Sequence, residues 1–226
     1  MSKHTRPLEE RTVVCEVRAA EDQQGMITGR PVVLNTWTDL GWFDEIIDGR
    51  ALDNTDLTDV RFLVNHDLSK IPLARSRRNN GNSTMQLITD AEGLQIKAQL
   101  DIENNAEAKS LYSAIQRGDI SGMSFMFAVR EHGDEWQDLD SDHPRRRIND
   151  IESIVEVSAV TFPAYDATTI NARSKEALES ARSALESARQ QTGEPLESDE
   201  TRSNDEHDLE LAKALFDFND KFNGGN

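Results

Sequence analysis

The stretch Ile120-Ser121-Gly122-Met123-Ser124-Phe125-Met126-Phe127 predicts a buried β-strand with a hydroxyl group at its centre. Alternate side chains of a strand point to opposite faces, so its bulky odd-numbered residues would share one face and Ser124 would lie on the other. An apolar face packed in a core would hold Ser124 rigidly, as a nucleophile requires. The competing interpretation is a small buried serine that only needs a hydrogen-bond partner.

A second apolar run, Phe62-Leu63-Val64-Asn65-His66-Asp67, ends at a candidate general base. A serine hydroxyl is a poor nucleophile until a base takes its proton. His66 alone follows an apolar run that can fix its position, whereas the other histidines lie in polar segments: His4, His132, His143 and His207. Asp67 is adjacent, but neighbouring strand residues face opposite ways, which disfavours direct pairing with His66. A purely structural histidine is the competing interpretation.

A third segment, Val155 to Tyr165, supplies a carboxylate, Glu156. On a strand beside the site, this carboxylate could accept the imidazole N–H and favour the tautomer that a base needs. The competing interpretation is a solvated strand residue. Ser121 and Ser158 are the rival candidates for the nucleophile.

Composition excludes several other classes of protein. The chain has 226 residues and a formal net charge of −17, which disfavours general binding to nucleic-acid phosphates. No apolar run approaches the ~18 residues that span a membrane, and the N-terminus lacks an apolar signal core. The single cysteine, Cys15, excludes a cysteine-rich zinc site, and no metal or nucleotide motif predicts a cofactor. The basic run from Pro144 to Arg147 is expected to form a solvated turn.

The predicted organisation is a flexible N-terminus (residues 1–10), a mainly β domain (11–172) and an acidic helical or disordered tail (173–226). The expected strands are Thr12–Val17, Pro31–Asn35, Val60–Asn65, Met85–Thr89, Leu94–Leu100, Met123–Arg130 and Ile154–Phe162. A helix is expected from Asn104 or Asn105 to Gln116, ended by Gly118, and a short helix over Trp42–Ile47. About seven strands with few flanking helices predict a closed or nearly closed β-barrel.

The tail contains a seven-residue repeat between residues 177 and 190, with leucine and alanine at coiled-coil spacing. A flexible acidic linker (191–208) and a terminal amphipathic helix (about 205–222) are expected to follow. Two interpretations stay open. The tail either only solubilises the chain, or it docks the chain to scaffold or to other copies and is then removed by self-cleavage in the linker.

The domain resembles the prohead (head-maturation) serine proteases of tailed bacteriophages, whose fold is similar to that of the herpesvirus assembly proteases. The stretches that carry this resemblance are Asn35–Arg50, Val64–Asp67, Asp90–Leu94, Gly122–Phe125 and Glu156–Ala164, in this order and spacing. The resemblance implies a herpesvirus-protease-like barrel, with His66 as base and Ser124 as nucleophile. It also implies capsid or scaffold protein as substrate, inside an immature head in the host cytoplasm.

Two features depart from the herpesvirus pattern. Those proteases use a second histidine as the third member of the triad, where this chain offers Glu156. They also place an arginine pair after that residue, whereas no arginine occurs here between Glu156 and Arg173. The oxyanion-stabilising group therefore cannot be carried over from that pattern. Arg75, Arg77 and Arg78 are candidates to approach the site, but an exposed loop is the favoured interpretation. A catalytically silent scaffold or assembly module with the same fold is the alternative to a serine endopeptidase.

Overall fold

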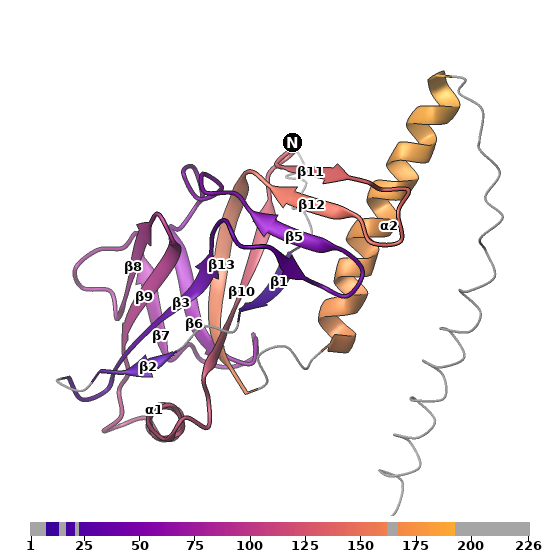
Figure 1. Ribbon diagram of the computed structural model, residues 1–226. Coiled ribbons are helices and arrows are strands. Elements are labelled where there is room, and N and C mark those ends of the chain that lie inside the picture. The colour runs from indigo at the N-terminus through magenta and orange to yellow at the C-terminus, as the bar shows by residue number, and fades with distance from the viewer. Residues whose placement is uncertain (1–7, 14–16, 21–22, 162–166, 193–226) are drawn as a thin grey trace, which may run out of the picture. The chain divides into compact units, whose positions relative to one another are not determined.

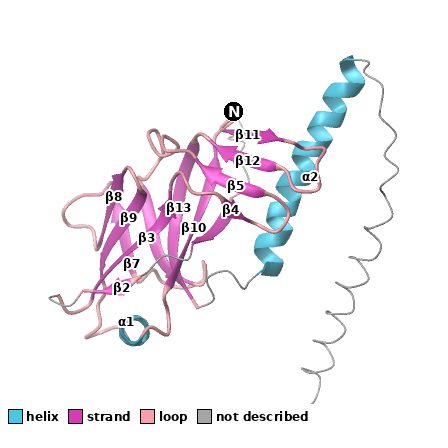
Figure 2. Ribbon diagram, in the orientation of Figure 1, coloured by secondary structure: helices cyan, strands magenta, loops and turns pink. Residues whose placement is uncertain are grey.

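The computed structural model describes residues 8–13, 17–20, 23–161 and 167–192. Strands are the main secondary structure of this part of the chain, which also contains two helices (Figure 2). The strands form one five-stranded and two four-stranded sheets (Figure 1). Within the described residues, neither helix has the length and apolar character needed to cross a membrane.

The five-stranded sheet has the order β1-β10-β13-β6-β7. It contains Ser124 and Glu156, and His66 follows the end of its strand β6. Its strands are β1 (Glu9–Val13), β10 (Gly122–Val129), β13 (Ile151–Val160), β6 (Asp59–Val64) and β7 (Ala74–Arg77). The pairing is antiparallel except between β13 and β6, which run parallel. Because β1 already begins at Glu9, part of the expected flexible N-terminus belongs to the sheet.

A second sheet, β2-β3-β9-β8, packs against the first through an apolar core (Figure 1). Its strands are β2 (Arg18–Ala19), β3 (Met26–Val33), β9 (Gly93–Gln99) and β8 (Met85–Asp90). The side chains of Met123, Phe125 and Phe127 lie in this core, as the alternation along β10 predicted. Gly29 allows β3 to pass close over β10, since a Cβ there would lie 2.3 Å from the sulfur of Met123.

The third sheet, β11-β12-β5-β4, corrects two expectations. Its strands are β11 (Asp134–Gln137), β12 (Arg145–Ile148), β5 (Asp44–Ile47) and β4 (Thr38–Asp39). The expected helix over Trp42–Ile47 is wrong, because its last four residues form β5, which pairs with both β12 and β4. The expected solvated turn over Pro144–Arg147 is also wrong, because Arg146 is buried among carboxylates.

The mainly β class is confirmed, but the closed barrel is not: in the part of the chain described here, none of the three sheets closes on itself. The ladder stops at β7. There the backbone N–H groups of Arg75 and Arg77 donate to the side-chain hydroxyls of Thr84 and Ser83 at 2.9 and 3.0 Å, instead of to a strand. Because these side chains occupy the outer edge of β7, β8 does not continue the first sheet and pairs with β9 in the second sheet.

Helix α1 (Ala106–Arg117) begins and ends as the sequence predicts. Asn105 is its N-cap and accepts hydrogen bonds from the N–H groups of Glu107 and Ala108, and Gly118 ends it at a φ of 77°. Helix α2 (Ala167–Thr192) contains the expected domain boundary at residue 172. The chain divides into two compact units, Met1–Ser183 and Ala184–Asn226. Most of the linker expected at 191–208, and all of the terminal helix expected at 205–222, fall outside the described residues.

Candidate active site

Ser124 lies in the middle of β10 and is fully buried. It is opposite Ser158 of β13 on one side and opposite Thr12 of β1 on the other. Because β10 is paired along both edges, the backbone around Ser124 is held in register by two ladders. The hydroxyl therefore projects from a fixed point of the sheet.

His66 follows β6 in a tight turn with unusual backbone geometry. Asn65 and His66 have φ values of 50° and 56°, in the left-handed region that is uncommon for residues other than glycine but that asparagine and histidine adopt more readily than most. The Asn65 side chain helps to hold this turn, because its amide accepts from the N–H of Thr161 at 2.9 Å and donates to the Thr161 hydroxyl at 3.0 Å. The turn thus fixes His66 against the end of β13.

The imidazole of His66 contacts both of the other predicted site residues. Its Nε2 lies 2.6 Å from Oγ of Ser124, and its Nδ1 lies in hydrogen-bond contact with Oε1 of Glu156. Glu156 is fully buried, so its carboxylate is far more effective as an acceptor than it would be in water. A carboxylate at Nδ1 favours the tautomer with its proton there, which leaves Nε2 free to accept the serine proton.

Ser158, a rival candidate for the nucleophile, has a different set of contacts. Its hydroxyl donates to Oε2 of Glu156 at 2.8 Å and accepts the backbone N–H of His66 at 3.1 Å. One hydroxyl therefore fixes the carboxylate and the turn that carries the imidazole. Sequence reasoning missed this role, although the two-residue spacing from Glu156 already placed both side chains on one face of a strand.

The remaining candidates lie apart from this cluster or outside the described residues. Ser121 precedes β10 and is exposed, and Asp67 accepts from the N–H and hydroxyl of Ser69. Arg75 pairs with Asp59, while Arg77 and Arg78 are exposed. His132 lies in an exposed turn. Cys15, His4 and His207 are outside the described residues.

His143 belongs to a group with metal-ligand spacing. One ligand atom each from His143, Asp39 and Asp44 lie within 4.8 Å of one another. The group is carried by the β4–β5 sheet and includes none of the three predicted site residues. An exposed set of this kind is common on acidic surfaces, and it does not bear on the chemistry at Ser124.

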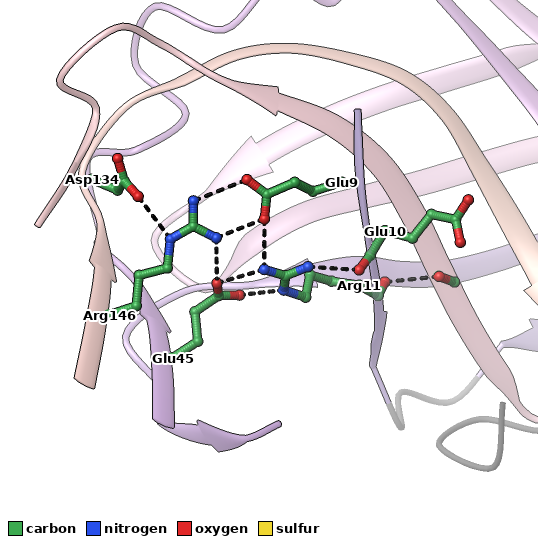
Figure 3. Close-up of polar contacts among 7 residues, drawn as sticks. Glu9, Glu10, Arg11, Glu45, Asp134 and Arg146 are labelled. Atoms are coloured by element: carbon green, nitrogen blue, oxygen red, sulfur yellow. Dashed lines mark hydrogen bonds and ion pairs between the residues drawn. The ribbon is translucent and has the colours of Figure 1, made fainter. Parts of the chain in front are cut away.

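A buried network of charges joins β1 to the third sheet (Figure 3). Arg11 donates twice to the carboxylate of Glu45, and Arg146 donates to Glu9, Glu45 and Asp134 (Figure 3). Burial alone would raise the pKa of Glu9, but hydrogen bonds from Arg146 and the charges of Arg11 and Arg146 outweigh it and lower the pKa to about 2. For Arg11, burial works against the charged form, yet the charge of Glu45 raises the pKa. Glu9 and Arg11 are therefore charged at neutral pH.

The model of the caudovirus prohead serine protease family matches residues 13–182. This match covers more than half of the chain and contains all three residues of the Ser124–His66–Glu156 cluster. No curated protein and no solved structure matches the chain. The chain belongs to the family of caudovirus prohead serine proteases.

Proposed function

We propose that the chain is a serine endopeptidase in which Ser124 is the nucleophile, His66 the general base and Glu156 the residue that orients His66. The observation that carries this assignment is that one imidazole contacts both partners, with Nε2 2.6 Å from the serine oxygen and Nδ1 on the buried carboxylate. A catalytic base must reach the proton it takes at ~2.6–3.2 Å, and this pair meets that requirement. A serine nucleophile is consistent with the description of the family as serine proteases. A serine, a histidine and an acid in contact form the arrangement of a catalytic triad.

The reaction is acyl transfer to Ser124 and then to water. The Ser124 oxygen attacks the carbonyl carbon of the scissile peptide bond while its proton passes to Nε2 of His66. The carbon–nitrogen bond then breaks, and His66 gives this proton to the leaving amine. Water, deprotonated by the same nitrogen, hydrolyses the acyl-serine and restores the hydroxyl. Glu156 stabilises the imidazolium that forms in both steps.

The substrates proposed for this site are the major capsid protein or its scaffold segment, inside the immature head in the host cytoplasm. The family description, which places these proteases in the prohead, supports this choice. Self-association or scaffold binding through residues 173–226, and self-cleavage between 190 and 208, remain proposals about segments that lie mostly outside the described residues. A catalytically silent assembly module is the alternative, and it gives no reason for a fully buried carboxylate to contact a histidine ring.

The test is covalent labelling of the full chain with a fluorophosphonate, followed by peptide mapping. Label on Ser124 is expected, and it should disappear in Ser124→Ala. The exposed Ser121→Ala serves as the matched control and should label as the wild type does. In co-expression with the capsid or scaffold protein, Ser124→Ala should leave the substrate full-length. Substrate processing by a folded Ser124→Ala protein would exclude the assignment.

A further inference from the structure

Strand β1 covers the candidate nucleophile. The main-chain carbonyl oxygen of Arg11 lies 2.8 Å from Oγ of Ser124, and the hydroxyl of Thr12 lies 3.2 Å from the same oxygen. Ser124 has no exposed surface, whereas the His66 side chain remains 16% exposed. The Arg11 carbonyl lies where a substrate carbonyl would have to approach Oγ of Ser124, so β1 and a substrate peptide would compete for this position.

The contact also affects the proton of Ser124. A hydroxyl has one proton to donate, and two acceptors lie within reach of it, the Arg11 carbonyl and Nε2 of His66. While the proton points at Arg11, the imidazole cannot accept it. The contact therefore opposes activation of the serine as well as blocking access to it.

Strand β1 lies on β10 in the manner of an extended peptide added to the edge of a sheet. It is antiparallel to β10, with Thr12 opposite Ser124 and Glu9 opposite Phe127. Addition of a strand to a sheet edge is a general mode of peptide recognition, in which main-chain bonds provide affinity and alternate side chains provide selectivity. The family match begins at residue 13, so Glu9–Thr12 precede the matched stretch.

The alternate side chains of β1 enter a buried charged site formed by Glu45 and Arg146. Arg11 binds Glu45 in a two-pronged pair, with Nη2 2.7 Å from Oε2. Glu9 binds Arg146 in the same way, at 2.6 and 2.9 Å. Glu45 and Arg146 are each only 3–4% exposed. A buried site of this kind favours an arginine and a glutamate, because a neutral side chain would lose the two-pronged pair and a like-charged one would be repelled.

We propose that Glu9–Val13 occupies the peptide-binding cleft of the protease as an internal inhibitor, and that the Glu45–Arg146 site makes the enzyme select substrates of the form Glu-x-Arg. Selected peptides have arginine at the residue whose carbonyl faces Ser124 and glutamate two residues before it. The proposal rests on the proposed function, since it takes Ser124 as the nucleophile. The enzyme is silent until β1 leaves β10, and a substrate strand then takes its place.

The first experiment measures how fast a fluorophosphonate labels Ser124 in the full chain. Arg11→Ala removes the main side-chain anchor of β1 and leaves Glu45 paired with Arg146. We expect labelling at least about tenfold faster than in wild type, because reactivity scales with the fraction of molecules in the open state. Arg30→Ala is the matched control and should label at the wild-type rate, since Arg30 pairs with Asp90 on the second sheet. Circular dichroism confirms that each variant is folded.

Arg11→Lys provides a milder variant in case Arg11→Ala does not fold. A lysine keeps the charge but loses the two-pronged geometry, so an intermediate labelling rate is expected. Equal labelling of Ser124 in wild type and in the folded Arg11 variants would overturn the inference and leave the proposed function intact. Absence of label on Ser124 in every folded protein would instead overturn the proposed function.

The second experiment tests selectivity with quenched fluorescent peptides and the Arg11→Ala protein. The parent peptide carries Leu-Glu-Glu-Arg-Thr-Val, the sequence of residues 8–13. Cleavage is expected after its arginine, and replacing that arginine by alanine, or the first glutamate by glutamine, should lower kcat/KM roughly tenfold or more. Adding Glu45→Gln to the protein should remove the preference for arginine. Equal cleavage of all three peptides, or cleavage elsewhere in the parent, would overturn the assignment of the Glu45–Arg146 site.

Discussion

His66 and Glu156 are 90 residues apart in the chain, yet the imidazole of one contacts the buried carboxylate of the other. The contact follows from the parallel pairing of β6 with β13, which places Val64 beside Ala159. The turn at Asn65 and His66 then directs the imidazole back over β13. The contact is a consequence of the strand pairing and does not itself hold the sheet together. Its loss should therefore lower turnover more than it lowers the stability of the fold.

Replacing Glu156 by glutamine tests this relationship. Glu156→Gln keeps the shape of the side chain but removes the charge that stabilises the imidazolium. By analogy with other triads, turnover should fall by about 10²–10⁴-fold. The control is Glu152→Gln, four residues earlier on the same strand and exposed to solvent, which should retain wild-type turnover. Turnover of Glu156→Gln within about threefold of wild type would remove Glu156 from the mechanism.

Ser158 is expected to act as a positioning residue. Ser158→Ala removes the acceptor of the His66 N–H and a donor to Glu156, so the imidazole should be less well oriented. We expect kcat to fall by roughly ten- to a hundredfold with KM unchanged, by analogy with residues that orient metal ligands, whose loss has effects of this size. Ser158→Thr keeps the hydroxyl and should restore most of kcat. If Ser158→Ala acted only by loosening the core, it would lower the free energy of unfolding, and Ser158→Thr would not restore kcat.

Helix α2 should contribute to the stability of the protease domain beyond the expected boundary at residue 172. Leu178 is 3% exposed, and Arg182 donates to the carbonyl oxygens of Leu139 and Ser141. Leu178→Ala should lower the free energy of unfolding by about 2–3 kcal/mol, as for other buried leucines. Leu185→Ala, at a half-buried position one heptad later, should cost clearly less in the same urea titration. Equal effects of the two substitutions would show that α2 does not pack on the domain through Leu178.

The three candidate residues, which the structure brings into contact, stand out in the sequence because each lies in a local pattern. That pattern is an apolar run that ends in, or surrounds, a polar group. The strand interiors of β6, β8, β9, β10 and β13 were predicted for the same reason. Trp42–Ile47 was mistaken for a helix because a short apolar run has no periodicity that separates the two structures. Pairing with β12, a hundred residues later, decides that it is a strand.

The buried charges could not be predicted from local patterns. Arg146 lies in a run of three arginines, which is typical of a solvated turn, and its partner Glu9 is 137 residues away. Buried and more exposed side chains alternate along β12, and the inward-facing ones are Arg146 and Ile148. Because one of these two is charged, the sequence lacks the apolar alternation that is typical of a half-buried strand. The sequence does not show the role of Ser158, because its two partners, Glu156 and the backbone N–H of His66, come together only when β13 pairs with β6.

The last prediction concerns the pH dependence of stability. The carboxyl group of Glu9 has an ordinary pKa of 4.5, and the pKa is lowered to about 2 in the folded chain. A lowered pKa means that the unfolded chain binds the proton more tightly, so the stabilisation is fully present above pH ~4.5 and is lost as the pH falls toward 2. A shift of this size corresponds to about 3 kcal/mol at neutral pH.

Glu9→Gln should therefore be clearly less stable than wild type in urea at pH 7, and the difference should shrink steadily at pH 4, 3.5 and 3. Glu103→Gln, at an exposed position, should follow the wild type at every pH. A Glu9→Gln deficit that stays constant from pH 7 to pH 3 would show that the charge of Glu9 does not hold β1 in place.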